Sequence, residues 1–234
     1  SCSRCRKQIY PLAGTILNKS STPLRSWFFA FFLFSQAKNG VAATELQRHL
    51  GVTYKTAWRM ARQIRGLMGE EVKLRGTVEA DETYIGGYQY GGKPGLGSEN
   101  KTAVFGLVER GGRVLAKVMK IRTKKVIPLI KRTVAKDAKL MTDEHRIYWN
   151  LPKLGYAWDS VVHWRREYVR GDVHTNTIEG FWSQFKRSLN GTYHSVSPKH
   201  LQRYVNEFVF RYNRRGSSSV FEELLGRIGR DSKV

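Results

Sequence analysis

The stretch that decides the fold is Thr77-Val78-Glu79-Ala80-Asp81-Glu82-Thr83-Tyr84-Ile85. Its threonine, valine, tyrosine and isoleucine residues favour a β-strand. Asp81 lies inside it, where a buried carboxylate is unfavourable unless it is paired or bound to a metal ion. The stretch therefore predicts a strand that carries a functional acid.

The segments on either side of this strand predict two kinds of structure. After it we expect a glycine-rich loop over 86–97, strands 101–109 and 113–121, helix 124–136, strand 138–142, a helix from Glu144, strand 160–164, and helices 177–189, 198–212 and 220–228. Three antiparallel strands followed by alternating helices and strands is the order of the ribonuclease-H-like fold. Before it we expect helices over 22–38, 44–50 and 53–68. The predicted fold class is α+β or α/β, with an N-terminal helix-turn-helix domain followed by a ribonuclease-H-like mixed β-sheet flanked by helices.

The helical segment has a pattern that is typical of DNA binding. Gly51 separates a short helix from a longer one, as in a helix-turn-helix. One face of the longer helix is apolar, and the rest of it carries the side chains that we predict to contact DNA: Lys55, Arg59, Arg62 and Gln63. A plain three-helix unit with a solvated basic face is the alternative.

The charge balance points to a polyanionic partner. The 234 residues include 41 Lys+Arg against 19 Asp+Glu, a formal net charge of +22, which favours nucleic acid. The aromatic content of 12% is too high for a disordered chain. The longest strongly apolar run, 27–34, is far shorter than the ~20 residues that cross a bilayer, and no secretory signal is recognisable. We expect a soluble, cytoplasmic, nucleoid-associated protein with no membrane partner.

Two further acids could join Asp81. Asp143 follows the fourth predicted strand, and Glu179 lies on the helix over 177–189. In a ribonuclease-H-like sheet the first and fourth strands are neighbours, so the two aspartates would meet at one end and the helix could deliver the third acid. The carboxylates of such a cluster repel one another unless cations lie between them. Their oxygen atoms suit Mg²⁺ or Mn²⁺ as ligands.

Each acid also has a plainer interpretation. Asp81 could be a salt-bridged strand residue, Asp143 a helix cap, and Glu179 a first-turn helix carboxylate. The rival acids are Glu82, Glu144 and Asp172. Strand alternation puts Glu82 on the face opposite Asp81.

Several strings resemble the motifs of ISXO-type insertion-sequence transposases, which are DDE-type enzymes related to the Merlin elements. Residues 78–87 (VEADETYIGG) resemble the first-aspartate motif, and 142–148 (TDEHRIY) the second. Residues 174–182 (HTNTIEGFW), followed by 185–187 (FKR), resemble the third motif. The likeness continues through residues 191–194, 197–204 and 210–213. The resemblance covers nearly the whole chain.

The resemblance implies a metal-dependent catalytic site with two divalent cations. Asp81, Asp143 and Glu179 are implied as the catalytic and metal-binding acids, with Lys186 as the associated basic residue. Lys186 and Arg187 would contact phosphate, or else form a solvated helix face. Some relatives have asparagine at the third position, so Asn176, one turn before Glu179, is the competing third residue and otherwise a DNA contact.

The resemblance also implies a zinc ribbon at the N-terminus. Cys2 and Cys5 look like its second cysteine pair, but the first pair is missing and structural zinc takes four ligands. Bound zinc is therefore not predicted. The expected domains are a ribbon remnant over 1–20, the helix-turn-helix domain over 21–70, the catalytic domain over 71–215 and a helical tail over 216–234.

The predicted function is that of a DNA transposase. It would bind the terminal inverted repeats of an insertion sequence, cleave phosphodiesters with metal ions, and transfer the freed 3′-hydroxyl strand into target DNA. The expected partner is double-stranded DNA, bound by a homodimer or a larger assembly. The alternatives are a catalytically silent DNA-binding regulator and a ribonuclease-H-like nuclease without strand transfer.

Overall fold

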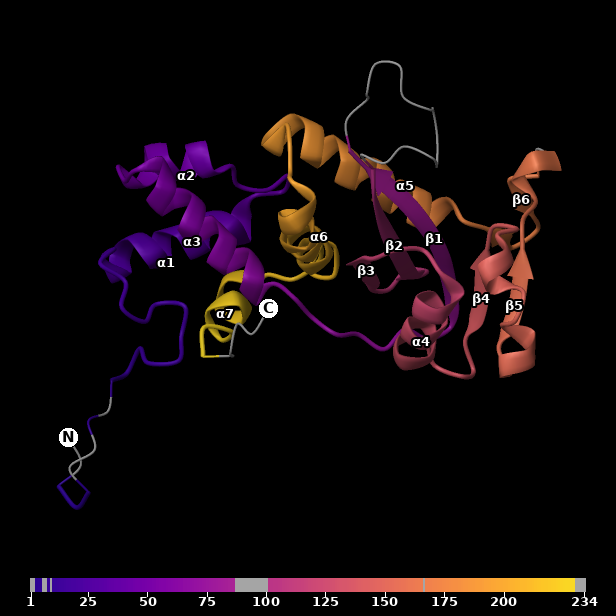
Figure 1. Ribbon diagram of the computed structural model, residues 1–234, viewed down its shortest axis with the longest axis horizontal. Helices are drawn as coiled ribbons and strands as arrows, with labels where there is room; N and C mark the ends of the chain where they lie inside the picture. Colours follow the sequence, from indigo (N-terminus) through magenta and orange to yellow (C-terminus); the bar gives the residue numbers. More distant parts are fainter. Residues whose placement is uncertain (1–2, 6–7, 9, 87–100, 166, 230–234) are drawn as a thin grey trace. The chain divides into compact units, whose positions relative to one another are not determined.

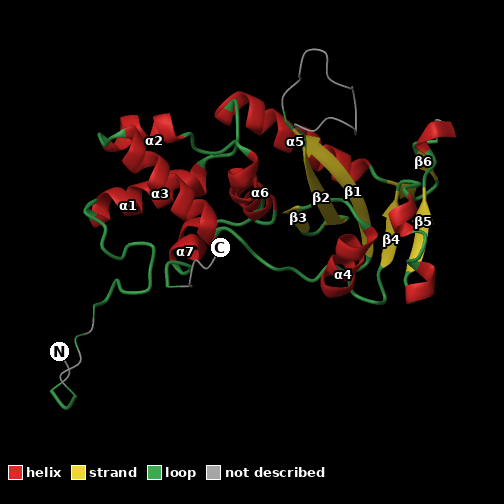
Figure 2. Cartoon of the chain, in the orientation of Figure 1, coloured by secondary structure: helices red, strands yellow, loops and turns green. Residues whose placement is uncertain are grey.

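The computed structural model describes residues 3–5, 8, 10–86, 101–165 and 167–229. They form two compact units, one of residues 1–69 and 214–234 and the other of residues 70–213. Figure 1 labels the helices and strands that follow, and Figure 2 colours them by type. The expected loop over 86–97 falls almost entirely outside the described residues.

The first unit is helical, and it contains the expected helix-turn-helix. Its elements are α1 Leu24–Gln36, α2 Ala43–Leu50, α3 Tyr54–Leu67 and α7 Val220–Leu225. Gly51 ends α2 in the left-handed region, at φ 63°, and Thr53 caps α3 by accepting a hydrogen bond from the Thr56 backbone N–H. The final helix belongs to this unit too, since Arg227 donates to the Leu67 and Gly69 carbonyls. Residues 216–229, the described part of the expected tail, therefore group with the N-terminal helices.

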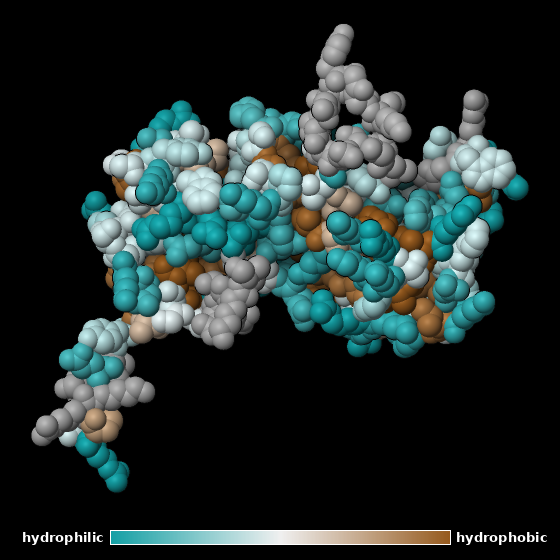
Figure 3. Space-filling view, in the orientation of Figure 1, coloured by the Kyte–Doolittle hydropathy of each residue, from teal (hydrophilic) through white to brown (hydrophobic). Residues whose placement is uncertain are grey.

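Helix α1 is apolar nearly all round. Trp27, Phe31 and Phe34 are buried against the unit's own core. Its other side leaves Leu24, Phe28, Phe29 and Phe32 between 40% and 46% exposed, and Figure 3 shows hydrophobic surface in this region. The segment 27–34 is thus part of a helix that is apolar on its buried side and aromatic on its exposed side. No helix in the described part of the chain is long and apolar enough to span a bilayer.

The second unit contains a five-stranded mixed sheet in the order β3-β2-β1-β4-β5. The strands are β1 Thr77–Ile85, β2 Thr102–Glu109, β3 Val114–Val118, β4 Lys139–Thr142 and β5 Ala157–Ser160. β1 pairs antiparallel with β2 and parallel with β4, and β4 pairs parallel with β5. Three antiparallel strands extended by two parallel ones form the ribonuclease-H-like sheet, which confirms the predicted fold class.

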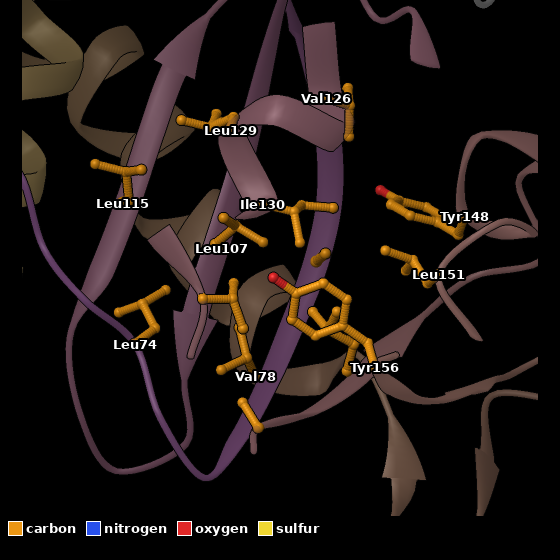
Figure 4. Packing of buried hydrophobic residues seen from close by; sticks show 14 of the residues in the cluster. Leu74, Val78, Leu107, Leu115, Val126, Leu129, Ile130, Tyr148, Leu151 and Tyr156 are labelled. Carbon is orange, nitrogen blue, oxygen red and sulfur yellow. The ribbon is translucent and has the colours of Figure 1, made fainter. Parts of the chain in front are cut away.

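Helices cover both faces of this sheet. One face packs against α4 Thr123–Thr133 and the turns after β4, in the aliphatic and tyrosine core of Figure 4. The other packs against α5 Asn176–Ser188 and α6 Pro198–Tyr212, around Phe181, Trp182 and Phe185. Residues alternate between these two cores along β1, because successive strand side chains point to opposite faces.

Two predicted elements differ in the structure. The helix expected after Asp143 is replaced by two short 3₁₀ turns, Arg146–Tyr148 and Pro152–Leu154, because a proline and Gly155 (φ 78°) stop the chain from continuing as a helix. The fifth strand lies at Ala157–Ser160 rather than 160–164. A small hairpin, β6 Val169–Arg170 and β7 Val173–His174, precedes α5.

Candidate functional site

The pairing of β1 with β4 brings two of the predicted acids together. The last pair of that parallel ladder is Glu79 opposite Met141. Asp81 lies two residues further along β1, and Asp143 lies two residues past Met141, just after the end of β4, where neighbouring strands are about 5 Å apart. The two aspartates are therefore delivered to the same edge by the register of the sheet.

Asp81 has an unusual electrostatic environment. Burial raises the pKa of its carboxyl to about 7, a backbone hydrogen bond from Glu82 opposes that rise, and the negative charges of Glu82, Asp143 and Glu179 add to it. Among the described residues Asp81 has no ion-pair partner, which argues against a salt-bridged strand residue. Asp143 and Glu179 thus both lie within electrostatic reach of Asp81.

Helix α5 carries the third acid on an exposed face. The hydroxyl of Thr175, the N-cap residue, donates to Glu179 Oε1 over 2.7 Å. Glu179, Lys186 and Arg187 are exposed, and so is Asn176 at the first position of the helix. The buried stripe of α5 faces the sheet instead. The choice between Glu179 and Asn176 stays a prediction, although only the charge of Glu179 acts on Asp81.

Glu82 forms a second acidic group behind the first. It lies on the opposite face of β1, as alternation predicts, and accepts a hydrogen bond from the Tyr148 hydroxyl over 3.3 Å. His145 Nε2 lies 4.0 Å from its carboxylate. Burial and the charge of Asp143 raise the pKa of Glu82 to about 7. Asp143 therefore repels acids on both faces of β1. Of the other rivals, Asp172 is exposed.

Sequence reasoning missed the group that holds α5 in place. Glu79 on β1 is fully buried, and its carboxylate accepts hydrogen bonds from the Thr177 and Ile178 backbone N–H groups over 2.8 and 3.0 Å. Arg110 Nε donates to the same carboxylate over 2.6 Å, and its guanidinium also bonds the His174 carbonyl. Glu79 thus caps α5 from a neighbouring strand. The sequence did contain a signal for this role, because Glu79 lies two residues before Asp81 in the strand and so faces the same side of the sheet.

A close contact between α5 and the sheet occurs beside Asp81. Gly106 of β2 is the residue paired with Asp81. A Cβ at Gly106 would lie 2.4 Å from Trp182 Cζ2 and 3.0 Å from Ile178 Cδ1. Glycine therefore allows the helix that carries Glu179 to pack directly onto the strand next to Asp81.

We predict that Gly106→Ala destabilises the second unit by about 1–3 kcal/mol, because the added methyl overpacks the α5 contact. It should also slow any chemistry at the acids, since small displacements of a catalytic group cost up to ~10²-fold. Gly180→Ala on the same helix is the matched control: nothing lies within 4 Å of its Cβ, so the change should stabilise by up to ~1 kcal/mol. Chemical denaturation of both variants tests this, and equal stabilities would contradict it.

The four residues predicted to bind DNA from α3 do not behave alike. Lys55 and Arg62 are exposed. Arg59, however, donates to the Thr22 hydroxyl over 3.2 Å, and Gln63 donates to the Ile16 carbonyl over 3.3 Å. Arg59 and Gln63 thus also fasten the preceding segment to α3. All four residues remain predicted DNA contacts.

Asp81, Asp143 and Glu179 offer carboxylate oxygens of the kind that bind divalent cations, but they are not arranged as a complete set of metal ligands. Within the described ranges, no group of three or more His, Cys, Asp or Glu side chains is close enough to hold a metal ion. Mutual repulsion of like charges favours such spacing when no cation is bound. All the donors are carboxylate oxygens, which suit Mg²⁺ or Mn²⁺. For zinc, Cys5 is exposed and free, and Cys2 lies outside the described residues.

The raised pKa of Asp81 predicts a pH-dependent instability. Between pH 4 and 7 the folded chain keeps a proton that the unfolded chain has lost, so the free energy of unfolding falls as pH rises through this window. In the presence of a chelator, Asp81→Asn should therefore raise the melting temperature at pH 8, by about 2–4 °C for each kcal/mol of instability removed, and by much less near pH 4. Calorimetry at the two pH values measures this. Mg²⁺ at pH 8 should stabilise the native chain but not the variant, and an equal response would contradict the prediction.

Comparisons with known proteins find related sequences over most of the chain. Residues 73–213 match the family described as the ISXO2-like transposase domain. A relative from Halobacterium salinarum, an uncharacterized protein in transposable element ISH50, is 30% identical over 229 residues, which cover 90% of this chain and 76% of the relative.

Two solved structures are also similar over most of the chain. The crystal structure of a pre-cleavage Mos1 transpososome shares 10% identity at a TM-score of 0.28, covering 88% of this chain and 79% of that one. The Mos1 transposase paired-end complex with left transposon end shares 12% identity at 0.28, covering 87% and 79%. These superpositions are too loose to transfer residues, so the fold assignment rests on the strand order of this chain.

Proposed function

The chain belongs to the ISXO2-like transposase family, and on that premise we propose that it cuts the ends of an insertion sequence and joins the freed 3′-hydroxyl to target DNA. The observation that carries the proposal is the register of β1 and β4, which brings Asp81 and Asp143 to the same edge of the sheet, with Glu179 near enough for its charge to act on Asp81. Carboxylates gathered against their own repulsion are typical of sites that bind cations and act on phosphates.

In this proposal Asp81, Asp143 and Glu179 hold two divalent cations, Mg²⁺ or Mn²⁺. When bound, such ions activate the attacking oxygen and stabilise the leaving oxygen of a phosphodiester. The partly buried location of Asp81 limits the access of competing water. Glu82, hydrogen-bonded to Tyr148, adds negative charge behind Asp143 and so strengthens its preference for a cation.

The basic residues of the chain bind and orient the DNA. Lys186 and Arg187, both exposed at the end of α5, neutralise strand phosphates near the acids. Lys55 and Arg62 on α3 contact the terminal inverted repeats, with α3 as the recognition helix. The net charge of +22 makes this binding strongly dependent on salt. Two element ends need two active sites, so we propose a dimer or a larger assembly on double-stranded DNA.

A combined cleavage and strand-transfer assay tests the function. Labelled duplexes from the element ends are incubated with a plasmid target, in Mg²⁺, in Mn²⁺ and in a chelator. Cut ends joined to the plasmid, seen only with metal, are the expected result. Cutting without joining would instead indicate a nuclease of the same fold, and DNA binding with no reaction would indicate a silent regulator.

A further inference from the structure

A cluster of basic side chains surrounds a pocket of about 510 Å³ on the α4 side of the sheet. Met119, Pro128 and Leu129 supply its apolar wall, and Leu129 also belongs to the core of Figure 4. Among the described residues, no acidic side chain lines this basic pocket. Its remaining lining consists of four cations: Lys117 on β3 and Lys124, Lys125 and Arg132 on α4. The composition of the pocket therefore suits an anion.

The ammonium group of Lys117 is partly buried without a partner. Lys117 lies one residue before the end of β3. Within the described part of the chain, its side chain makes no hydrogen bond or ion pair. Burial lowers the pKa of Lys117, the negative charge of Glu71 opposes that shift, and the positive charge of Arg132 adds to it. A desolvated cation without a partner is unfavourable in the folded chain, and an anion in the pocket would relieve that cost.

The cations of α4 are exposed along one side of the helix. Lys124 and Lys125 lie in its first turn, where positive charge opposes the helix dipole, so the fold gains nothing from them there. Arg132, in the last turn, pairs over 3.6 Å with Glu71, but both side chains are more than half exposed, and such pairs contribute little. Lys124 and Arg132 are eight residues apart, about 12 Å at the helical rise. That length matches about three to four base pairs at 3.4 Å each, so the row suits a run of phosphates.

The register of the sheet places Lys117 level with the acids. Lys117 is paired with Phe105, which is paired with Glu82, the neighbour of Asp81. Directly paired residues point to the same face, so Lys117 lies on the Glu82 side of the sheet, opposite α5. Two strand spacings separate Lys117 from Glu82, about 10 Å. Because a major groove is about 12 Å wide, one duplex held at the pocket by its phosphates can also reach the acids.

Strand transfer brings two DNA molecules to one set of acids. In the proposed function, Lys186 and Arg187 neutralise phosphates from the α5 face of the sheet. The basic pocket lies on the other face, within reach of the same acids. We propose that this pocket binds phosphates of the target duplex and holds that duplex beside the acids for joining. The inference rests on the proposed function, which supplies the two DNA substrates.

Lysine footprinting locates the bound duplex without requiring catalysis. The full chain, in chelator, is treated with an acetylating reagent alone, with a duplex of unrelated sequence, or with poly-glutamate, and the modified lysines are measured by mass spectrometry. The duplex should protect Lys124 and Lys125 by at least about fivefold. Lys139, exposed at the start of β4, should keep its rate. Equal protection by poly-glutamate would identify an acidic protein as the occupant and overturn the proposal.

Variants of the pocket separate target binding from end cleavage. Lys117→Met and Lys125→Gln should each lower joining to a plasmid by about eightfold at 0.1 M salt, because one phosphate contact contributes a slope of about −0.9 to log affinity against log salt. Cutting of labelled element ends should stay within about twofold. Lys139→Gln removes the same charge outside the pocket and should change neither step. Lys117→Met should also melt at the same or a higher temperature, since a desolvated cation is removed, which excludes misfolding as the cause.

The outcomes separate this inference from the function on which it rests. Equal losses of cutting and joining in the pocket variants would overturn the assignment to the target duplex. Undiminished joining in both variants, or unprotected pocket lysines on a chain that binds the duplex, would overturn the pocket and leave the function standing. If the native chain neither cut nor joined DNA, the proposed function would fail. The footprint alone would then decide whether the pocket binds a DNA backbone.

Discussion

Replacing Asp143 by Asn is expected to lower the rate of DNA cleavage by at least ~10³-fold while DNA affinity stays within about twofold. The two side chains have the same shape, so the Asp143 turn, which accepts a hydrogen bond from the His145 N–H, keeps an oxygen acceptor. What is lost is a negative charge beside Asp81 and Glu82. The pKa values of both neighbours should fall, because the charge of Asp143 helps to raise them.

The measurement is single-turnover cleavage of labelled end duplexes, with a filter-binding titration on the same preparations. Asp137→Asn is the matched control, since this aspartate is exposed in the loop just before β4. It should leave both quantities unchanged. A parallel loss of binding and cleavage in Asp143→Asn would mean that this residue supports the fold and not the chemistry.

The proximity of Asp81 and Asp143 could be predicted from the sequence because their positions follow from the topology of the sheet. A strand with an aspartate inside it, and a second aspartate ending the fourth strand, need only the order of strands to become neighbours. That order is the strand sequence β3-β2-β1-β4-β5. Their roles as metal ligands remain predictions, because the register fixes adjacency and not coordination.

Side-chain partners beyond that topology could not be read in advance. Arg59 and Gln63 have helical spacing that suits an exposed face, yet each finds an acceptor far away in sequence, Thr22 and Ile16. Periodicity locates a face of a helix but not the segment that returns to cover it. The role of Glu79 could not be predicted for the same reason, since its hydrogen-bond partners on α5 are 98 and 99 residues away.

Glu79→Gln is expected to destabilise the second unit by about 2–4 kcal/mol. Four donors converge on this fully buried carboxylate: Arg110 Nε, the Thr177 hydroxyl, and the Thr177 and Ile178 N–H groups. An amide has one acceptor oxygen and brings an NH₂ group against these donors. It also removes the negative charge that favours the N-terminus of α5. Glu71→Gln is the control, because Glu71 is 78% exposed in its pair with Arg132 and should change stability by less than ~1 kcal/mol.

A specific effect on the site distinguishes positioning from general stability. The N-terminus of α5 carries Glu179 only one residue beyond Ile178, so a loosened helix start displaces that acid. At a temperature where both proteins are fully folded, Glu79→Gln should raise the Mn²⁺ concentration that gives half-maximal cleavage by about tenfold, while Glu71→Gln should not. Arg110→Met should shift the same midpoint, and the double variant should be less than additive, because Glu79 and Arg110 act through one contact. An unchanged midpoint in Glu79→Gln, with stability lowered as expected, would restrict this carboxylate to holding the fold together.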